Sequence, residues 1–204
     1  MRMFKSSLLN RKVAGGLTRD VAMKALKLLD QKLGEANRRM ALTLIGGGVM
    51  LLVHRTRLDT RDLDVIPPGR SDIDLLEKCR DEVTREMKEE GVNLPVAWIN
   101  AQAAPIFQEQ RKYFSSNDFY RVGYLKFPNL DIVVAAPEAL LAMKVQALRD
   151  PNDWDDVDAI CRILKIRSWE QFVEIVEPRV EDMGIIGNDD ILRLRGIIAS
   201  LARA

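Results

Sequence analysis

The sequence predicts an α/β fold of the α+β kind, a small mixed sheet with flanking helices, followed by a C-terminal helical bundle. Up to about residue 136, short apolar runs that end at glycine or proline alternate with segments of helical periodicity. From Pro137 onward the periodicity is helical only. The chain has 204 residues, of which 47% are hydrophobic, so it can bury a sizeable core. We therefore divide it into an α/β core, residues 1–136, and a helical region, residues 137–204.

The elements of the first half follow from periodicity and from their boundary residues. Thr18 is a candidate N-cap for a first helix, and Ser71 is one for a later helix. Apolar runs bounded by glycine or proline predict strands, and Pro128 and Asn129 predict a hairpin turn. The predicted helices are 18–37, a helix start at 49–54, and 71–90; the predicted strands are 41–45, 62–66, 96–99, 120–127 and 130–135. The second half adds helices at 138–148, 153–164, 169–176 and 189–202.

Composition excludes several classes of protein. The 31 basic and 30 acidic side chains give a net charge of +1, which argues against a protein that coats nucleic acid by bulk charge. Cys79 and Cys161 are far apart and form no CxxC motif, so we expect a reducing compartment and no disulfide framework. No apolar run approaches the roughly 18 residues of a membrane span, and the basic start lacks a signal-peptide core. We expect a soluble, cytoplasmic protein without a membrane partner.

Three glycines, Gly46, Gly47 and Gly48, follow the predicted strand 41–45. Glycines at such a turn let the backbone approach a ligand closely and turn its N–H groups toward an anion such as a phosphate. A tight strand-to-helix turn without a ligand is the alternative interpretation. A dinucleotide-binding fingerprint is excluded because position 51 is Leu51, and a P-loop is excluded because no Gly-Lys-Ser/Thr follows.

The segment Asp62-Leu63-Asp64 lies in a predicted strand downstream of these glycines. Alternate residues of a strand share one face with Cα atoms roughly 6.7 Å apart, so both carboxylates converge on one place. Paired carboxylates are oxygen ligands that Mg²⁺ prefers, together with phosphate oxygens and water. Three other Asp-x-Asp pairs lie in predicted helices or helix starts, where residues two apart do not face each other: 72/74, 153/155 and 156/158.

A third carboxylate is available at Asp131, at the start of the predicted strand 130–135. If that strand lies beside the strand of Asp62 and Asp64, Asp131 completes a three-carboxylate site for two metal ions. The alternative is that Asp131 is a hairpin-turn residue.

These motifs resemble those of a known superfamily. Gly47-Gly48, thirteen intervening residues and then Asp62-Leu63-Asp64-Val65 are similar to the signature of polymerase-β-type nucleotidyltransferases. The stretch LDIVVAAPEALLAMKVQALRDPNDWDDVDAICRIL, residues 130–164, resembles the AbiEii/MenT-like toxins and related small bacterial nucleotidyltransferase-like proteins. The stretch LPVAWI, residues 94–99, followed by Asn100, is similar to the same relatives.

The resemblance implies a nucleotidyltransferase-type fold and a Mg²⁺-dependent transfer of a nucleoside monophosphate from an NTP to an acceptor such as tRNA or a protein. It also implies that the protein is the toxin of a toxin–antitoxin pair, with an antitoxin as its partner. The implied catalytic and metal-binding residues are Asp62, Asp64 and Asp131; the implied nucleotide-binding residues are Gly47, Gly48, Arg57, Thr60 and Lys144.

Several alternatives stay open at this point. Gly48 stands where many members of the superfamily carry serine, and Arg57 and Thr60 are spaced one residue wider than in their counterparts. These departures favour a catalytically inactive nucleotide-binding or protein-interaction module. A hydrolase that uses the same metals is a third hypothesis. Arg149 and Asp153, Asp155 and Asp156 match a region in which relatives carry an arginine and a spaced Asp pair, or they form a capped helix with an ion pair.

Overall fold

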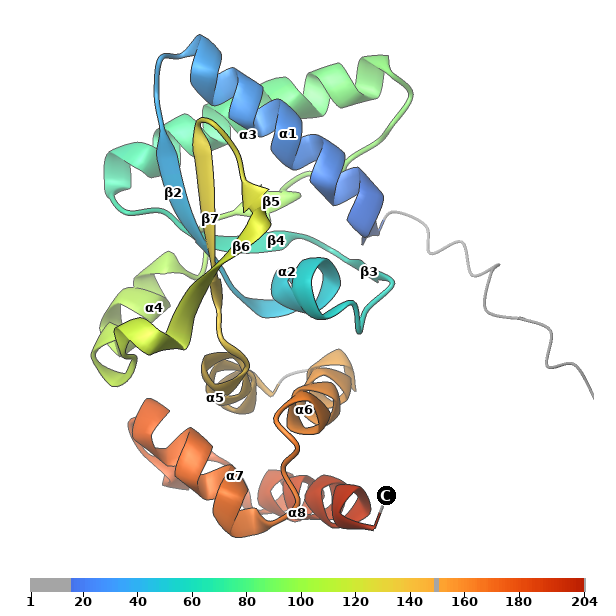
Figure 1. The fold of residues 1–204 in the computed structure, drawn as a ribbon, viewed down its shortest axis with the longest axis vertical. Helices are drawn as coiled ribbons and strands as arrows, with labels where there is room; N and C mark the ends of the chain where they lie inside the picture. Colours follow the sequence, from blue (N-terminus) through green and yellow to red (C-terminus); the bar gives the residue numbers. More distant parts are fainter. Residues whose placement is uncertain (1–15, 149–150, 204) are drawn as a thin grey trace, which may run out of the picture.

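The computed structural model describes residues 16–148 and 151–203, and its centre is a five-stranded sheet in the order β5-β4-β2-β7-β6 (Figure 1). A separate two-stranded sheet pairs β1 with β3. The strand bounds are β1 Leu17–Thr18, β2 Met40–Leu44, β3 Asp59–Thr60, β4 Leu63–Ile66, β5 Ile99–Asn100, β6 Phe119–Lys126 and β7 Leu130–Ala135.

Strand directions decide which chain segments meet at one edge of the sheet. β2 and β7 are parallel, whereas β4 runs antiparallel to β2. The carboxyl ends of β2 and β7 therefore lie at the same edge as the amino end of β4. Helices α2 (Gly46–Val49) and α5 (Pro137–Ala147) begin there, directly after β2 and β7. We call this edge the α2–α5 edge.

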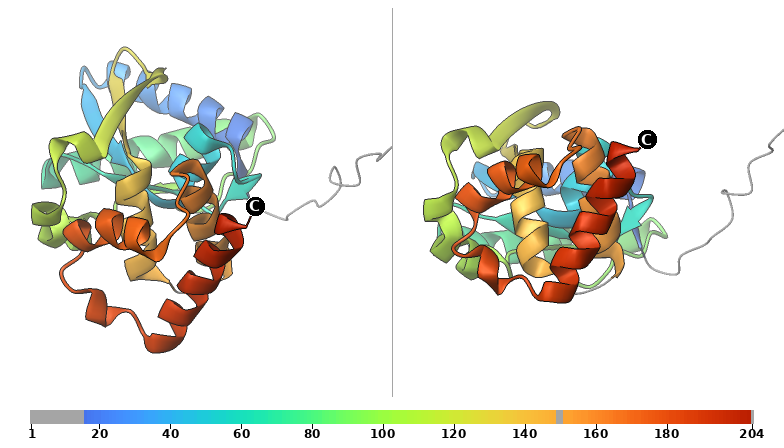
Figure 2. Two further views of the ribbon diagram at one scale, coloured as in Figure 1. Left: turned by 60° about the horizontal axis from the view of Figure 1, so that its bottom comes forward. Right: turned by 90° about the horizontal axis from the view of Figure 1, so that it is seen from below.

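Helices cover the sheet in two groups (Figure 1). α1 (Arg19–Glu35) packs against α3 (Arg70–Glu89) on one side, and the C-terminal helices lie at the other end of the molecule. Figure 2 turns that end forward and shows α7 and α8 lying outside α5 and α6. The remaining helical segments are η1 Met50–His54, α4 Ala104–Gln110, η2 Arg111–Tyr113, η3 Ser116–Asp118, α6 Pro151–Ile163, α7 Trp169–Val176, η4 Glu177–Arg179, η5 Met183–Ile185 and α8 Asn188–Ala202. Every helix in the described ranges is too short or too polar to cross a lipid bilayer.

One cluster of buried apolar side chains runs through both halves of the chain, from Leu26 in α1 to Leu194 in α8. Leu63 and Val65 of β4 are fully buried in it, as the alternation of β4 predicts. Because α5 packs against α2 as well as against α6 and α7, the regions 1–136 and 137–204 share this core.

The structure confirms that the chain combines helices with a mixed sheet, and it agrees with most predicted elements. α1 begins after Thr18, and β6 and β7 form the predicted antiparallel hairpin. The four helices expected after Pro137 are present as α5, α6, α7 and α8. Strand periodicity and boundary residues were therefore sufficient for these elements.

Four predictions of local structure were wrong or incomplete. The three glycines do not form a loop before the helix, because α2 already begins at Gly46 and continues into the π-helical turn η1. Gly69, and not Ser71, is the N-cap residue of α3. The predicted strand 96–99 shrinks to β5, since Val96 lies in a turn and is 95% exposed. α4 was missed altogether, although a proline in its first turn, Pro105, is typical of a helix start.

Candidate functional site

The backbone turns sharply at Gly46, where β2 leads into α2. Its φ of +63° lies in the left-handed region that glycine adopts at little cost. A Cβ atom at this position would lie 3.2 Å from Oδ2 of Asp64. The absence of a side chain thus lets the start of α2 approach the Asp64 carboxylate closely.

Gly47 and Gly48 have different surroundings. A Cβ atom on Gly47 would lie 2.9 Å from Oγ1 of Thr60 and 3.0 Å from Nη1 of Arg57, so this glycine faces polar groups. A Cβ atom on Gly48 would lie 2.9 Å from a methyl carbon of Leu44, in the core. Gly47 and Gly48 were predicted to form the phosphate-binding pair; Gly48 is buried against apolar side chains, whereas Gly46 is the glycine that approaches the Asp64 carboxylate.

Asp64 lies in β4 and Asp62 immediately precedes this strand, at the α2–α5 edge. Burial raises the pKa of the Asp62 carboxyl, and a nearby Arg61 and a hydrogen bond from Asn100 oppose the rise. Burial also raises the pKa of Asp64; the negative charge of Asp62 adds to the rise, whereas Asn100 and Lys144 oppose it. The Asn100 amide interacts with both carboxyl groups, and the negative charge of Asp62 acts on Asp64.

Asn100 is a member of the site that the sequence analysis did not assign. It lies beside Asp64 in the parallel pairing of β4 with β5 and is only 5% exposed. Its Nδ2 donates a hydrogen bond of 3.2 Å to Oδ2 of Asp62, and its Oδ1 accepts one of 3.0 Å from the backbone N–H of Gln102. The amide nitrogen and the amide oxygen of Asn100 therefore each make a hydrogen bond, and the one from the nitrogen orients the Asp62 carboxylate.

Two cations share one buried carboxylate next to this pair. Arg57 donates two hydrogen bonds of 2.7 Å to the two oxygens of Asp156, which is 2% exposed. Lys144 of α5 lies 2.9 Å from the same carboxylate and 2.6 Å from Oδ1 of Asp153. We call Arg57, Lys144, Asp153 and Asp156 the cation cluster.

The predicted nucleotide-binding residues thus come together, apart from Gly48. Thr60 and Arg57 both lie against Gly47, despite the wider spacing that their sequence positions show. Lys144 is close enough to Asp64 to stabilise its charged form. The helix α6 supplies Asp153, which pairs with Lys144 after β7, and Asp156, which pairs with Arg57 from the segment between β2 and β4.

Asp131 is placed elsewhere, which corrects the prediction of a three-carboxylate site. It pairs with Ala41 in the register of β7 with β2, whereas Leu44 pairs with both Val65 and Val134. Asp131 therefore lies about four residues, or about 13 Å along the strands, from the level of Asp64. Its Oδ2 accepts a hydrogen bond of 3.0 Å from Nε of Arg121. Because β2 and β7 are parallel, the start of β7 lies at the edge of the sheet opposite to Asp64. Hydrophobic periodicity does not reveal in which direction two strands pair.

The donor set fits a magnesium ion held by two carboxylates. In the part of the chain that the structure describes, no three His, Cys, Asp or Glu side chains are grouped so as to hold a metal ion. Mg²⁺ is commonly bound through one or two carboxylates, with substrate phosphates and water as its other ligands. Asp62 and Asp64, with the glycine turn beside them, match that arrangement.

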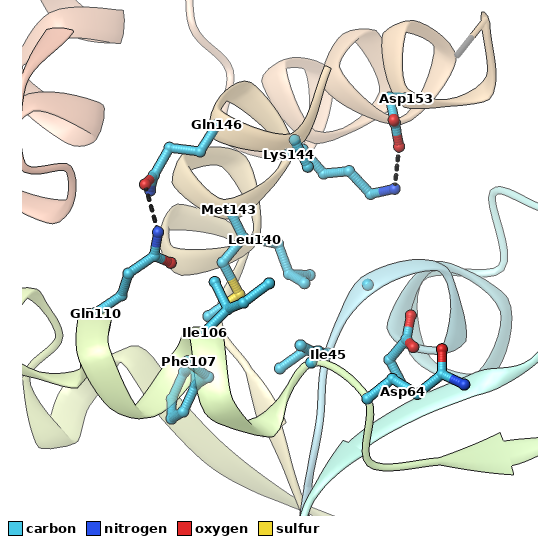
Figure 3. Close-up of a pocket in the computed structure, with 14 residues that line it drawn as sticks. Ile45, Asp64, Ile106, Phe107, Gln110, Leu140, Met143, Lys144, Gln146 and Asp153 are labelled. Carbon is cyan, nitrogen blue, oxygen red and sulfur yellow. Dashed lines mark hydrogen bonds and ion pairs between the residues drawn. The ribbon is translucent and has the colours of Figure 1, made fainter. Parts of the chain in front are cut away.

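A cavity of about 490 Å³ opens in front of Asp64 (Figure 3). Asp64, Lys144 and Asp153 contribute charged side chains to its lining, with Gly46 next to Asp64. Residues of α4 and α5 contribute most of the remainder: Ile106, Phe107, Gln110, Leu140, Met143, Gln146 and Ala147, with Ile45, Gln102 and Ala103 completing the lining. Of the predicted site residues, Asp64 and Lys144 border this hollow, whose size suits a small molecule.

Comparison of the chain with protein-family models, with curated proteins and with solved structures gives no match.

Proposed function

We propose that this protein is a Mg²⁺-dependent nucleotidyltransferase, which transfers a nucleoside monophosphate from an NTP to an acceptor hydroxyl. The observation that carries the proposal is the approach of the glycine turn at Gly46 to the carboxylate of Asp64, with Lys144 lining the same end of the cavity. A triphosphate with a metal ion requires these three features together: backbone close enough for phosphate oxygens, paired carboxylates, and a cation.

Each residue has a role in this proposal. Asp62 and Asp64 hold the Mg²⁺ ion, which neutralises phosphate charge and polarises the reacting phosphate group when it is bound. Gly46 and Gly47 leave room for the phosphates, and Lys144 neutralises negative charge as pyrophosphate leaves. Asn100 orients Asp62. The acceptor hydroxyl gives its proton to water as its oxygen forms a bond to the α-phosphorus, and the bond from the α-phosphorus to the bridging oxygen of the β-phosphate breaks, so that pyrophosphate leaves. Positioning and charge account for most of the catalysis.

Tyrosine, serine and threonine hydroxyls of a protein, or the hydroxyls of tRNA, are the acceptors that we propose. This part of the proposal, and the pairing of the chain with an antitoxin, rest on the sequence resemblance. The cavity supports only the general point that a small polar group can reach Asp64 from solvent.

The test is transfer of label from each α-³²P-NTP to total tRNA, and to the protein itself, in the presence of Mg²⁺. We expect Asp64→Asn, which keeps the size of the side chain, to reduce labelling at least about 100-fold because one of two metal ligands is lost. Asp74→Asn is the matched control, since Asp74 belongs to another Asp-x-Asp pair and is exposed on α3. Labelling that survives Asp64→Asn contradicts the proposal.

A catalytically inactive nucleotide-binding module is the second candidate. The displacement of Asp131 from the site favours it, because the two-metal arrangement then lacks its third carboxylate. The same experiment separates the two candidates. NTP and Mg²⁺ that bind in calorimetry without labelling tRNA or the protein support the module, whereas labelling that depends on Asp64 supports the enzyme.

A further inference from the structure

The cavity beside Asp64 changes in character from one end to the other. Asp64, Lys144 and Asp153 lie toward one side in Figure 3, and a hydrogen bond between Gln110 and Gln146 lies toward the opposite side. Apolar side chains occupy the space between these two ends: Ile45, Ile106, Leu140 and Met143. A ligand that fills this cavity is therefore charged at one end, apolar in its middle and capable of hydrogen bonding at the other end.

The apolar part of the cavity lining contains one side chain that is held in place by packing and one that is open to solvent. Phe107 is 8% exposed, and its ring stacks on Phe114 at 5.8 Å and meets the edge of Phe119 at 5.7 Å, so its position is set by packing. Ile106, one residue earlier in α4, is 54% exposed although it lines the cavity. A large aliphatic side chain open to solvent beside a hollow is typical of a surface that an apolar group covers.

The two glutamines at the far end have hydrogen-bonding capacity to spare. Nε2 of Gln110 donates to Oε1 of Gln146 at 2.9 Å, and Nε2 of Gln146 donates to the backbone carbonyl of Ala142 at 3.4 Å. A primary amide has two N–H donors and an oxygen with two lone pairs, so each glutamine keeps further donors or acceptors. Side-chain amides arranged in this way can read the polar edge of a planar group.

We propose that the apolar middle of the cavity and the Gln110–Gln146 pair bind the base of the NTP and determine which base is preferred. This inference rests on the proposed function, which places the triphosphate at Gly46 and Asp64. A nucleobase combines two apolar faces with a polar edge, and it is joined through a sugar to the charged phosphates. From Asp64 to the Gln110–Gln146 pair, the cavity lining is likewise first charged, then apolar and then polar. Gln110 and Gln146 are thus specificity-determining residues, not catalytic ones.

The first experiment compares ligands with and without a base. Calorimetry with Mg²⁺ measures the binding of ATP, GTP, CTP, UTP and inorganic tripolyphosphate to the full chain. Because a base buries apolar surface against the cavity lining, which tripolyphosphate does not, we expect the preferred NTP to bind at least about tenfold more tightly than tripolyphosphate. We also expect the four NTPs to differ in affinity.

The second experiment changes the amides and the apolar wall. Gln110→Leu and Gln146→Leu should reduce the difference in affinity between the best and the worst NTP by about tenfold, with tripolyphosphate binding unchanged. Gln108→Leu is the matched control, since Gln108 is an exposed residue of α4 that does not line the cavity. Met143→Trp should fill the apolar part and weaken NTP binding but not tripolyphosphate binding; circular dichroism establishes that the variant is folded.

The outcomes distinguish this inference from the proposed function. Equal affinity for tripolyphosphate and all four NTPs overturns the base site but leaves a phosphate site at Asp64. NTP preferences that survive both glutamine changes overturn the inference as well, and they do so even if Met143→Trp does not fold. Failure of NTPs and tripolyphosphate alike to bind overturns the proposed function itself.

Discussion

Two buried groups of charges connect the strands to the C-terminal helices, and they are built differently. In the first, Asp118, the last residue of η3 directly before β6, is 3% exposed and forms an ion pair of 2.7 Å with Nε of Arg179. Its other oxygen accepts hydrogen bonds from the backbone N–H and the hydroxyl of Ser115, at 2.7 and 2.9 Å. Arg179 also donates to the carbonyl of Ile175. This carboxylate has one cation and is fully hydrogen-bonded.

The second group is the cation cluster, where the single carboxylate of Asp156 binds both Arg57 and Lys144. It also adjoins the cavity beside Asp64, because Lys144 and Asp153 line that cavity, whereas neither Asp118 nor Arg179 belongs to its lining. This difference separates two kinds of charged group. A carboxylate with one cation and satisfied hydrogen bonds stabilises the fold, whereas cations that share carboxylates beside this cavity are placed to contact an anion that enters it.

The largest effect on stability is expected from Asp156→Asn. Removal of this charge leaves two partly buried cations with weaker pairing, so the free energy of unfolding should fall by about 3 kcal/mol in urea titrations. Tripolyphosphate with Mg²⁺ should then stabilise the variant more than it stabilises the wild-type protein, because an anion replaces the lost carboxylate. An equal increase in both proteins would contradict a phosphate-binding role for the cation cluster.

Asp118→Asn is the counterpart and should lower the free energy of unfolding by about 2 kcal/mol, since the partly buried Arg179 loses its charged partner. Tripolyphosphate should give no increase beyond that of the wild type. The cost should also depend on pH. Burial raises the pKa of Asp118, but hydrogen bonds from Ser115 and Arg179 outweigh burial and leave it below its ordinary value of 3.8. The charged carboxylate therefore stabilises the fold above about pH 4, and this contribution is lost as the pH falls further.

Urea titrations of the wild type and of Asp118→Asn between pH 7 and pH 3 measure this dependence. The difference between the two proteins should be largest at pH 7 and should shrink below pH 4. A difference that stays constant over the whole range would show that packing, and not the ion pair, determines the cost of the substitution.

Asp64→Asn should have the opposite sign. Because burial and the charge of Asp62 raise the pKa of Asp64, its charged form destabilises the fold at neutral pH. The substitution should stabilise the ligand-free protein by about 1 kcal/mol at pH 7, a typical gain when a functional residue is replaced. The gain should vanish as the pH falls through the raised folded-state pKa toward the ordinary value of 3.8, since the carboxyl is then protonated. A loss of stability at pH 7 would place Asp64 with the structural charges.

The sequence was sufficient to predict features that depend on local pattern. The alternation of β4 placed Leu63 and Val65 in the core, and the structure agrees. The breakers Pro128 and Asn129 correctly marked the turn between β6 and β7. Such features depend on a few neighbouring residues, so periodicity and turn-forming residues are sufficient to predict them.

Features that depend on the pairing of distant strands were not predictable in the same way. Asn100 joins the site because β5 runs parallel to β4, and Asp156 joins it because α6 packs beside α5. The packing of Gly48 against Leu44 is likewise invisible in a run of three glycines. Each depends on a contact whose partners no short-range pattern connects.

The smallest effect is expected from Asp131→Asn, which tests whether the sheet register excludes this residue from the site. Its ion pair with Arg121 is open to solvent, with the Arg121 side chain 65% exposed, so its loss should change the free energy of unfolding by less than about 0.5 kcal/mol. Because Asp131 lies about 13 Å along the strands from the level of Asp64, transfer of label from α-³²P-NTP should also be unchanged. Asp64→Asn, assayed in parallel, shows the loss expected when a proposed metal ligand is replaced. A comparable loss of label transfer for Asp131→Asn would mean that β7 shifts its register when substrate binds. Asp131 would then belong with the charged residues at the cavity, and not with those that are open to solvent.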